Sequence, residues 1–276
     1  MIAIIAEMLT YTFLVRAIIV GLLVSLCASL LGVSLVLKRY SMIGDGLSHV
    51  GFGAMAISMA TGMAPLTVSI PIVVAAAILL LRISESSKIK GDAAIALIST
   101  SSLAVGAIII ALTTGMNMDV CNFMFGSILA MSVADVQLSV ALSGVVILLY
   151  IFFYSKIFAV TFDETFSRAV GTRAGVYNML LAVLTAVTIV LGMRMMGALL
   201  ISALVIFPSL TSMRVCKRFK TVIICSGVVA LVCFCVGVVL SYWYSLPTGA
   251  SVVSVNLLLF ILLSCLSMIK GGLRKS

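Results

Sequence analysis

Apolar runs of about 20 residues recur along the whole of this 276-residue chain, and each could cross a bilayer as an α-helix. Hydrophobic residues make up 63% of the sequence and charged residues only 9%, whereas soluble domains carry about a quarter charged residues. The runs lack the alternation of apolar and polar residues that is typical of transmembrane β-strands. We therefore expect an all-α, polytopic helical membrane protein with a single transmembrane domain over residues 1–276 and no sizeable soluble domain.

These runs predict about nine transmembrane spans. The spans are expected at residues 13–37, 41–61, 65–83, 93–113, 133–154, 174–191, 197–213, 222–243 and 250–268. A short Gly-Met-Arg-Met-Met link is expected between the sixth and seventh spans. The apolar stretch 120–131 is shorter than a span, so we expect a re-entrant or interfacial helix there.

The basic residues predict the orientation in the membrane. The net charge is +9, and the Lys and Arg residues gather at the ends of the apolar runs. With nine spans and a cytoplasmic C-terminus, only Arg16 and Arg194 of the 17 basic residues lie outside, as the positive-inside rule favours. We expect a multi-pass protein of the plasma (inner) membrane with its N-terminus outside and its C-terminus in the cytoplasm. The positive-inside rule accounts for the net positive charge, so the charge does not indicate a nucleic-acid partner.

One predicted span carries two potential metal ligands. His49 is the only histidine, and Asp45 is the only acidic residue within a predicted span apart from Asp135, which lies at the outer start of the fifth span. Because they are four positions apart, they share one face of a helix. A carboxylate and an imidazole together suit zinc, manganese and iron. Two ligands are too few for a complete site, but a two-fold dimer would supply four. Alternatively, Asp45 caps its helix and His49 forms a hydrogen bond within the bundle.

A polar segment at about residues 158–173 separates the fifth and sixth spans. Asp163 is a plausible helix N-cap, and Glu164 would lie in the first turn. Phe162, Phe166 and Ala169 then recur at helical spacing, with Arg168 alongside. This pattern predicts a short amphipathic helix that could bind a cytoplasmic partner, or else an ordinary interfacial helix.

Small residues predict close packing in two helices. Gly44, Gly46, Gly51 and Gly53 surround the acid–histidine pair and would let a neighbouring helix approach closely. In the seventh span, Gly197 and Ser202 belong to a second small-residue face, and Pro208 should kink the helix. Such a helix suits either a moving gate or static packing.

Several enzyme motifs are missing from the sequence. It has no phosphate-binding loop of the form G-x-x-x-x-G-K-[ST] and no H-E-x-x-H metalloprotease motif. A single histidine also leaves no readable Ser-His-Asp set. We therefore expect a protein that is not an enzyme.

With these stretches in hand, the chain resembles the permease subunit of ABC-type divalent metal importers, the ABC-3 family of zinc, manganese and iron uptake. The resemblance rests on the order and spacing of FLVRAIIVGLL (13–23), VLKRYSMIGDGLSH (36–49), FDETFSRAVG (162–171), MGALLISALVIFPS (196–209) and LSYWYSLPTGASVV (240–253). The family's pattern often has Ala at the position of Gly46, which should not affect metal ligation.

The resemblance implies a fold, partners and site residues. It implies a permease like that of type II ABC importers, a second copy of the chain, a separate cytoplasmic ATPase subunit and an extracytoplasmic metal-binding protein. It places Asp45 and His49 on the metal path and residues 163–168 in ATPase coupling. The metal would be the transported substrate, with zinc favoured over manganese or iron, and no cofactor would be bound permanently. Alternatives are a metal transporter driven by an ion gradient and a membrane scaffold without transport.

Overall fold

The computed structural model describes residues 10–86, 91–113 and 132–272. Every regular element in these ranges is a helix, which confirms the predicted all-α class. The predicted re-entrant segment at residues 120–131 lies outside the described residues. The helices are α2 (Thr12–Leu37), α3 (Ile43–Thr61), α4 (Pro65–Ser86), α5 (Gly91–Thr113), α7 (Val133–Phe152), α8 (Tyr154–Phe162), α9 (Glu164–Ala169), α10 (Ala174–Met196), α11 (Ala198–Val215), α12 (Phe219–Tyr244) and α13 (Thr248–Gly272).

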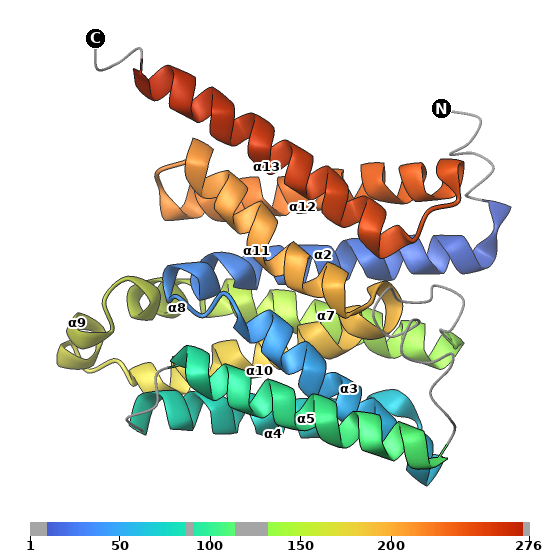
Figure 1. Ribbon diagram of the computed structural model, residues 1–276. Coiled ribbons are helices and arrows are strands. Elements are labelled where there is room, and N and C mark those ends of the chain that lie inside the picture. Colours follow the sequence, from blue (N-terminus) through green and yellow to red (C-terminus); the bar gives the residue numbers. More distant parts are fainter. Residues whose placement is uncertain (1–9, 87–90, 114–131, 273–276) are drawn as a thin grey trace.

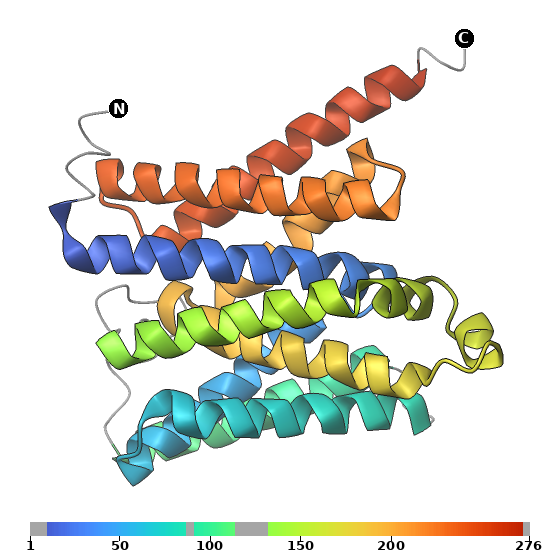
Figure 2. The ribbon, with the colours of Figure 1, turned by 180° about the vertical axis from the view of Figure 1, so that it is seen from behind.

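Helix α2 runs through the middle of the bundle, and the other long helices pack around it in layers (Figures 1 and 2). Helices α12 and α13 lie on one side of α2, and α4 and α5 form the opposite edge. Helix α3 packs mainly against α4 and α5 and also contacts α10 and α11. The short helices α8 and α9 lie at one end of the bundle, at the left of Figure 1. Segments far apart in sequence are thereby brought together around α2 and α3.

The predicted count of nine spans is not supported. Among the described residues, seven helices are long and apolar enough to cross a membrane, namely α2, α4, α5, α7, α10, α12 and α13. Helix α3 is outside this group because glycine, serine, Asp45 and His49 lower its mean hydropathy. In helix α11, the apolar stretch that the described residues contain is Leu200–Val215. Helix α3, which carries the candidate site, is therefore less apolar than the seven helices of this group.

Two predicted helix boundaries are also corrected. The expected link at residues 192–196 is helical, because α10 continues to Met196 and only Gly197 separates it from α11. Gly197 has φ +86°, a value that favours glycine, so this residue makes the reversal between the two helices. The segment at residues 158–173 holds two helices rather than one, because α8 ends at Phe162 and α9 begins at Glu164.

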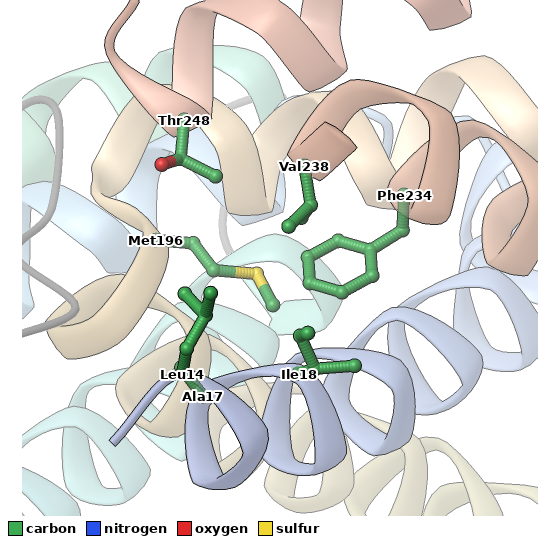
Figure 3. A pocket seen from close by; sticks show the side chains of 7 residues that line it. All are labelled: Leu14, Ala17, Ile18, Met196, Phe234, Val238 and Thr248. Carbon is green, nitrogen blue, oxygen red and sulfur yellow. The ribbon is translucent and has the colours of Figure 1, made fainter. Parts of the chain in front are cut away.

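A small apolar pocket lies between α2, α10, α12 and α13. Phe234 and Met196 extend into it toward one another, and Thr248 supplies the one polar side chain of the lining (Figure 3). Met193 and Met196 are both buried in the core. The methionines that flank Arg194 in the sequence are thus packing residues at these two positions, and the pocket has no set of metal donors.

Candidate metal site

The turn between α2 and α3 positions the first residues of the candidate site. Helix α2 ends at Leu37, and Lys38 is its C-cap residue. Arg39 follows with φ +62°, in the left-handed region. The Tyr40 amide then donates to the Leu35 carbonyl at 2.9 Å, and the Tyr40 hydroxyl lies 3.1 Å from Ser84 Oγ of α4. These contacts reverse the chain within a few residues and start α3 at Ile43.

Asp45 and His49 lie side by side on α3, as their spacing predicts. The distance from His49 Nε2 to Asp45 Oδ2 is 3.6 Å, and the two side chains are 30% and 42% exposed respectively. This distance exceeds that of a good hydrogen bond. Two ligands of a tetrahedral ion, each about 2.1 Å from the metal, lie about 3.4 Å apart. Both side chains are therefore partly exposed, and their donor atoms are already spaced as two ligands of one ion would be.

The second ring nitrogen of His49 is unusual. Nδ1 is buried and has no hydrogen-bond partner among the described residues. Leaving a buried polar atom unpaired costs about 1–3 kcal/mol. A metal-binding histidine normally donates its second N–H to a neighbour, which fixes the ring. In this conformation His49 is held by packing and by Asp45 alone.

Asp45 and His49 do not make a complete metal site with the other residues that the structure describes. No group of three or more His, Cys, Asp or Glu side chains gathers anywhere in the described part of the structure. First-row divalent metals take at least four ligands. The described residues therefore supply no third His, Cys, Asp or Glu ligand beside the pair, which agrees with the count made from the sequence.

Close packing against α5 holds α3 in place. A Cβ atom at Gly53 would lie 2.9 Å from the Ser102 carbonyl oxygen, and one at Gly106 would lie 2.9 Å from Gly53 Cα. Real Cβ atoms do not come this close to backbone atoms, so glycine is required on both sides of this contact. The sequence singled out the glycines of α3 but not their counterpart Gly106.

Helix α11 covers the start of α3 beside Asp45. A Cβ atom at Gly44 would lie 3.7 Å from Ser202 Cα, an ordinary contact distance. The Ser202 hydroxyl donates to the Ala198 carbonyl within its own helix at 3.1 Å. Pro208 lies inside α11, which continues to Val215. Ser202 thus packs against Gly44, the residue before Asp45, whereas Gly197 lies outside α11 at its junction with α10.

The predicted N-cap at Asp163 is confirmed. Asp163 has φ −145° and ψ 96°, and its Oδ1 accepts a hydrogen bond from the Phe166 amide at 2.8 Å. The same extended backbone ends α8, so Phe162 and Phe166 lie on different helices rather than on one amphipathic helix. Both rings are largely exposed, Phe162 at 60% and Phe166 at 65%. The two exposed aromatic side chains therefore come from the end of α8 and the start of α9, whereas a single amphipathic helix was expected.

Glu164 joins α9 to two long helices. Its Oε2 lies 3.3 Å from Lys38 Nζ at the end of α2 and accepts from Asn178 Nδ2 of α10 at 3.1 Å. Its Oε1 accepts from Arg168 Nη2 at 2.6 Å. Partial burial raises the pKa of the Glu164 carboxyl, but hydrogen bonds from Asn178 and Arg168 and the charge of Lys38 outweigh this effect and hold it below its usual value. Sequence reasoning missed Asn178, because nothing local links it to Glu164.

The fold and the site together define a class: a polytopic helical membrane protein with an acid–histidine pair on α3. The ABC 3 transport family model matches residues 10–267, so the chain belongs to that family. The chain is 28% identical over 251 residues to the manganese import system permease protein ScaB of Streptococcus gordonii, with 91% of this chain and 90% of that protein aligned. It is 26% identical to the high-affinity zinc uptake system membrane protein ZnuB of Haemophilus influenzae, covering 91% and 97% of the two chains.

A solved structure has a closely similar fold. A chain in the structure of PsaBC from Streptococcus pneumoniae in complex with Fab superimposes with a TM-score of 0.85. The two chains are 29% identical, and the match covers 95% of each. The family that the sequence motifs indicate is thus confirmed over nearly the whole chain.

Proposed function

We propose that this chain is the transmembrane subunit of an ATP-driven importer of a divalent transition metal, and that the metal passes the Asp45–His49 pair. The observation that carries the proposal is the 3.6 Å separation of the two donor atoms on a half-open face of α3. The relatives named for manganese import and zinc uptake support the substrate class. ATP hydrolysis belongs to a separate subunit in this proposal, and the permease itself is a single transmembrane domain that is not an enzyme.

The metal path requires a second copy of the chain. One chain supplies two ligands, and a two-fold dimer with the pair facing its axis supplies two aspartates and two histidines. The purified dimer should then bind one zinc or manganese ion per two chains with an affinity that depends on His49. Stoichiometric binding of one ion to each isolated chain would contradict the shared site.

The proposed docking site for the ATPase is the exposed end of α8 and α9. The Phe162 and Phe166 rings project there, and Asp163, Glu164 and Arg168 set the shape of α9. Phe162→Asp or Phe166→Asp should reduce co-purification of the ATPase subunit with the permease. Tyr244→Asp is a matched control, because Tyr244 is 62% exposed at the opposite end of the bundle. Equal recovery of the ATPase with all three variants would count against the docking site.

The proposed orientation has the N-terminus outside and the C-terminus in the cytoplasm of a plasma-membrane protein. The ends of α2, α4 and α11 and the beginnings of α5 and α12 lie at the same end of the bundle as α9 (Figure 1). Lys38, Arg39, Arg214, Lys217 and Arg218 belong to these ends, and such clustering favours the cytoplasmic side. An extracytoplasmic metal-binding protein would deliver the metal at the opposite end.

The proposed topology still has nine crossings, with α3 and α11 as spans shielded by the other helices. These helices have 19 and 18 residues, which corresponds to about 27–28 Å at 1.5 Å per residue. A helix that is surrounded by protein tolerates polar residues that lipid would reject. Accessibility labelling of single cysteines at both ends of α3, in intact cells, tests this topology. Labelling of both ends from the same side would contradict it.

Metal uptake by cells that carry Asp45→Ala or His49→Ala tests the main proposal. We expect uptake to fall at least about tenfold while the complex assembles normally, because each change removes two of four ligands from a dimer. Asp92→Ala is the control, because Asp92 is an exposed acid in the first turn of α5. Normal uptake by an assembled Asp45 or His49 variant would overturn the role of the pair. Competition among zinc, manganese and iron in the same assay identifies the metal, so the expected preference for zinc stays a prediction.

A further inference from the structure

A partly buried polar cluster joins three helices at the end of the bundle where α9 lies. It consists of Lys38 at the C-cap of α2, Glu164 at the start of α9 and Asn178 in the second turn of α10. Lys38 Nζ lies 3.3 Å from Glu164 Oε2 and also donates to Asn178 Oδ1, while Asn178 Nδ2 donates to the same Glu164 oxygen at 3.1 Å. The three side chains therefore close a ring of mutual contacts.

The cluster is partly shielded from water. Side-chain exposure is 10% for Lys38 and 35% for Glu164, and Asn178 is 6% exposed. A charge removed from water at such a position needs partners, and removing one partner leaves the other uncompensated. Lys38 and Glu164 satisfy each other's charge here. Separating α2 from α9 would break this ion pair, so the two helices are expected to move together.

The cluster connects to the metal pair by a short stretch of backbone. Lys38 is followed by Arg39 in the left-handed region and by Tyr40, whose amide is bonded back to Leu35. Helix α3 begins at Ile43, and Asp45 lies in its first turn. No flexible linker separates Lys38 from Asp45, so a displacement of Lys38 is transmitted through this turn to the start of α3.

We propose that Lys38, Glu164 and Asn178 are positioning residues that transmit movement of α9 to the Asp45–His49 pair. The inference rests on the proposed function, since it assumes that an ATPase moves α9 and that the pair lies on the metal path. In this arrangement α9 acts on the bundle through the Glu164 carboxylate, and Lys38 carries the displacement to the α2–α3 turn. A cluster that served only as a static anchor would affect folding and assembly but not the coupling of transport to ATP hydrolysis.

The test uses the full complex of permease and ATPase in liposomes and measures metal ions transported per ATP hydrolysed. Glu164→Gln keeps the shape of the side chain and removes its charge, and Lys38→Met removes the opposite charge. We expect the assembled complexes of both variants to transport about tenfold fewer metal ions per ATP hydrolysed than the unaltered complex. The paired exchange Lys38→Glu with Glu164→Lys should recover much of the ratio. Lys217→Met, which removes an exposed basic charge at the same end, should leave the ratio unchanged.

Three outcomes of this experiment would contradict the proposed role of the cluster. An unchanged transport ratio in assembled Glu164→Gln complexes would overturn the inference, and so would loss of assembly in this isosteric variant, because that is the behaviour of an anchor. A lowered ratio that the charge exchange does not recover would also contradict a role for the ion pair. Failure of the proposed function is visible separately, as absence of metal transport by the unaltered complex or normal transport by Asp45→Ala.

Discussion

Arg194 Nη2 lies 3.2 Å from Asp135 Oδ2 and ties the last turn of α10 to the first turn of α7. Both side chains are only 15% exposed. The same Asp135 oxygen accepts a hydrogen bond from the Ser132 amide at 3.1 Å, and the Asp135 amide donates to Ser132 Oγ at 3.1 Å. Asp135 therefore completes a capping box and an ion pair at once. The sequence placed both residues on the outer side, but only the fold brings them together.

Breaking this ion pair should destabilise the permease. We expect Asp135→Asn and Arg194→Met each to cost about 2 kcal/mol, a value between those of exposed and fully buried pairs. The double variant should cost less than the sum of the two, because both changes remove one interaction. Thermal unfolding of the purified protein in detergent measures the effect, with Arg16→Met, an exposed arginine at the start of α2, as the control. Additive losses would show that the two residues act independently.

Gly32 should not tolerate even a methyl group. A Cβ atom at this position would lie 2.0 Å from the Val205 carbonyl oxygen, so α2 and α11 would have to separate. We expect Gly32→Ala to cost about 1–3 kcal/mol and to lower Tm by several degrees. Gly144→Ala in α7 is the matched control, because no atom lies within 4 Å of the added Cβ and alanine favours the helix. The prediction is wrong if the two variants unfold at the same temperature.

The glycines of α3 should differ in their tolerance of alanine. At Gly46 the added Cβ would lie 2.5 Å from Ile95 Cγ2, a side-chain atom, and 3.9 Å from the nearest backbone atom, the Ile95 carbonyl oxygen. At Gly53 it would meet the Ser102 backbone at 2.9 Å. Gly46→Ala should therefore retain most metal uptake, whereas Gly53→Ala should displace α3 and reduce uptake several-fold. Comparable uptake by both variants, normalised to the amount of protein in the membrane, would contradict this ranking.

The contribution of Glu164 to stability should depend on pH. Its pKa in the folded protein is below the usual value of 4.5, so its stabilising effect is fully present above that value and is lost as the pH falls through the folded pKa. The difference in Tm between the unaltered protein and Glu164→Gln should be constant above about pH 5 and shrink below the usual pKa. Thermal unfolding in detergent between about pH 7 and pH 3 provides the measurement. A difference that stays constant down to the lowest pH would show that Glu164 is not held as an anion by its partners.

Local features were predictable because they depend on residues close together in sequence. Apolar runs located every long helix to within a few residues, and the i, i+4 spacing placed Asp45 beside His49. Asp163 was recognised as an N-cap because capping involves only the next three residues. The two boundary errors have local causes as well. Residues 192–196 continue α10, because Gly197 alone makes the reversal into α11. The extended backbone at Asp163, which caps α9, also ends α8.

Hydropathy in the sequence determined that this protein is a helical membrane protein, and the four-residue spacing of Asp45 and His49 placed them on a single helix face. The order of its motifs indicated the permease family. Only the tertiary structure decided that Lys38 meets Glu164 and Asn178, that Asp135 meets Arg194, and that Gly106 of α5 receives Gly53 of α3. The physical reason is the range of the interactions. Helix periodicity and capping act over about four residues, whereas these contacts join residues that become neighbours only when the helices pack.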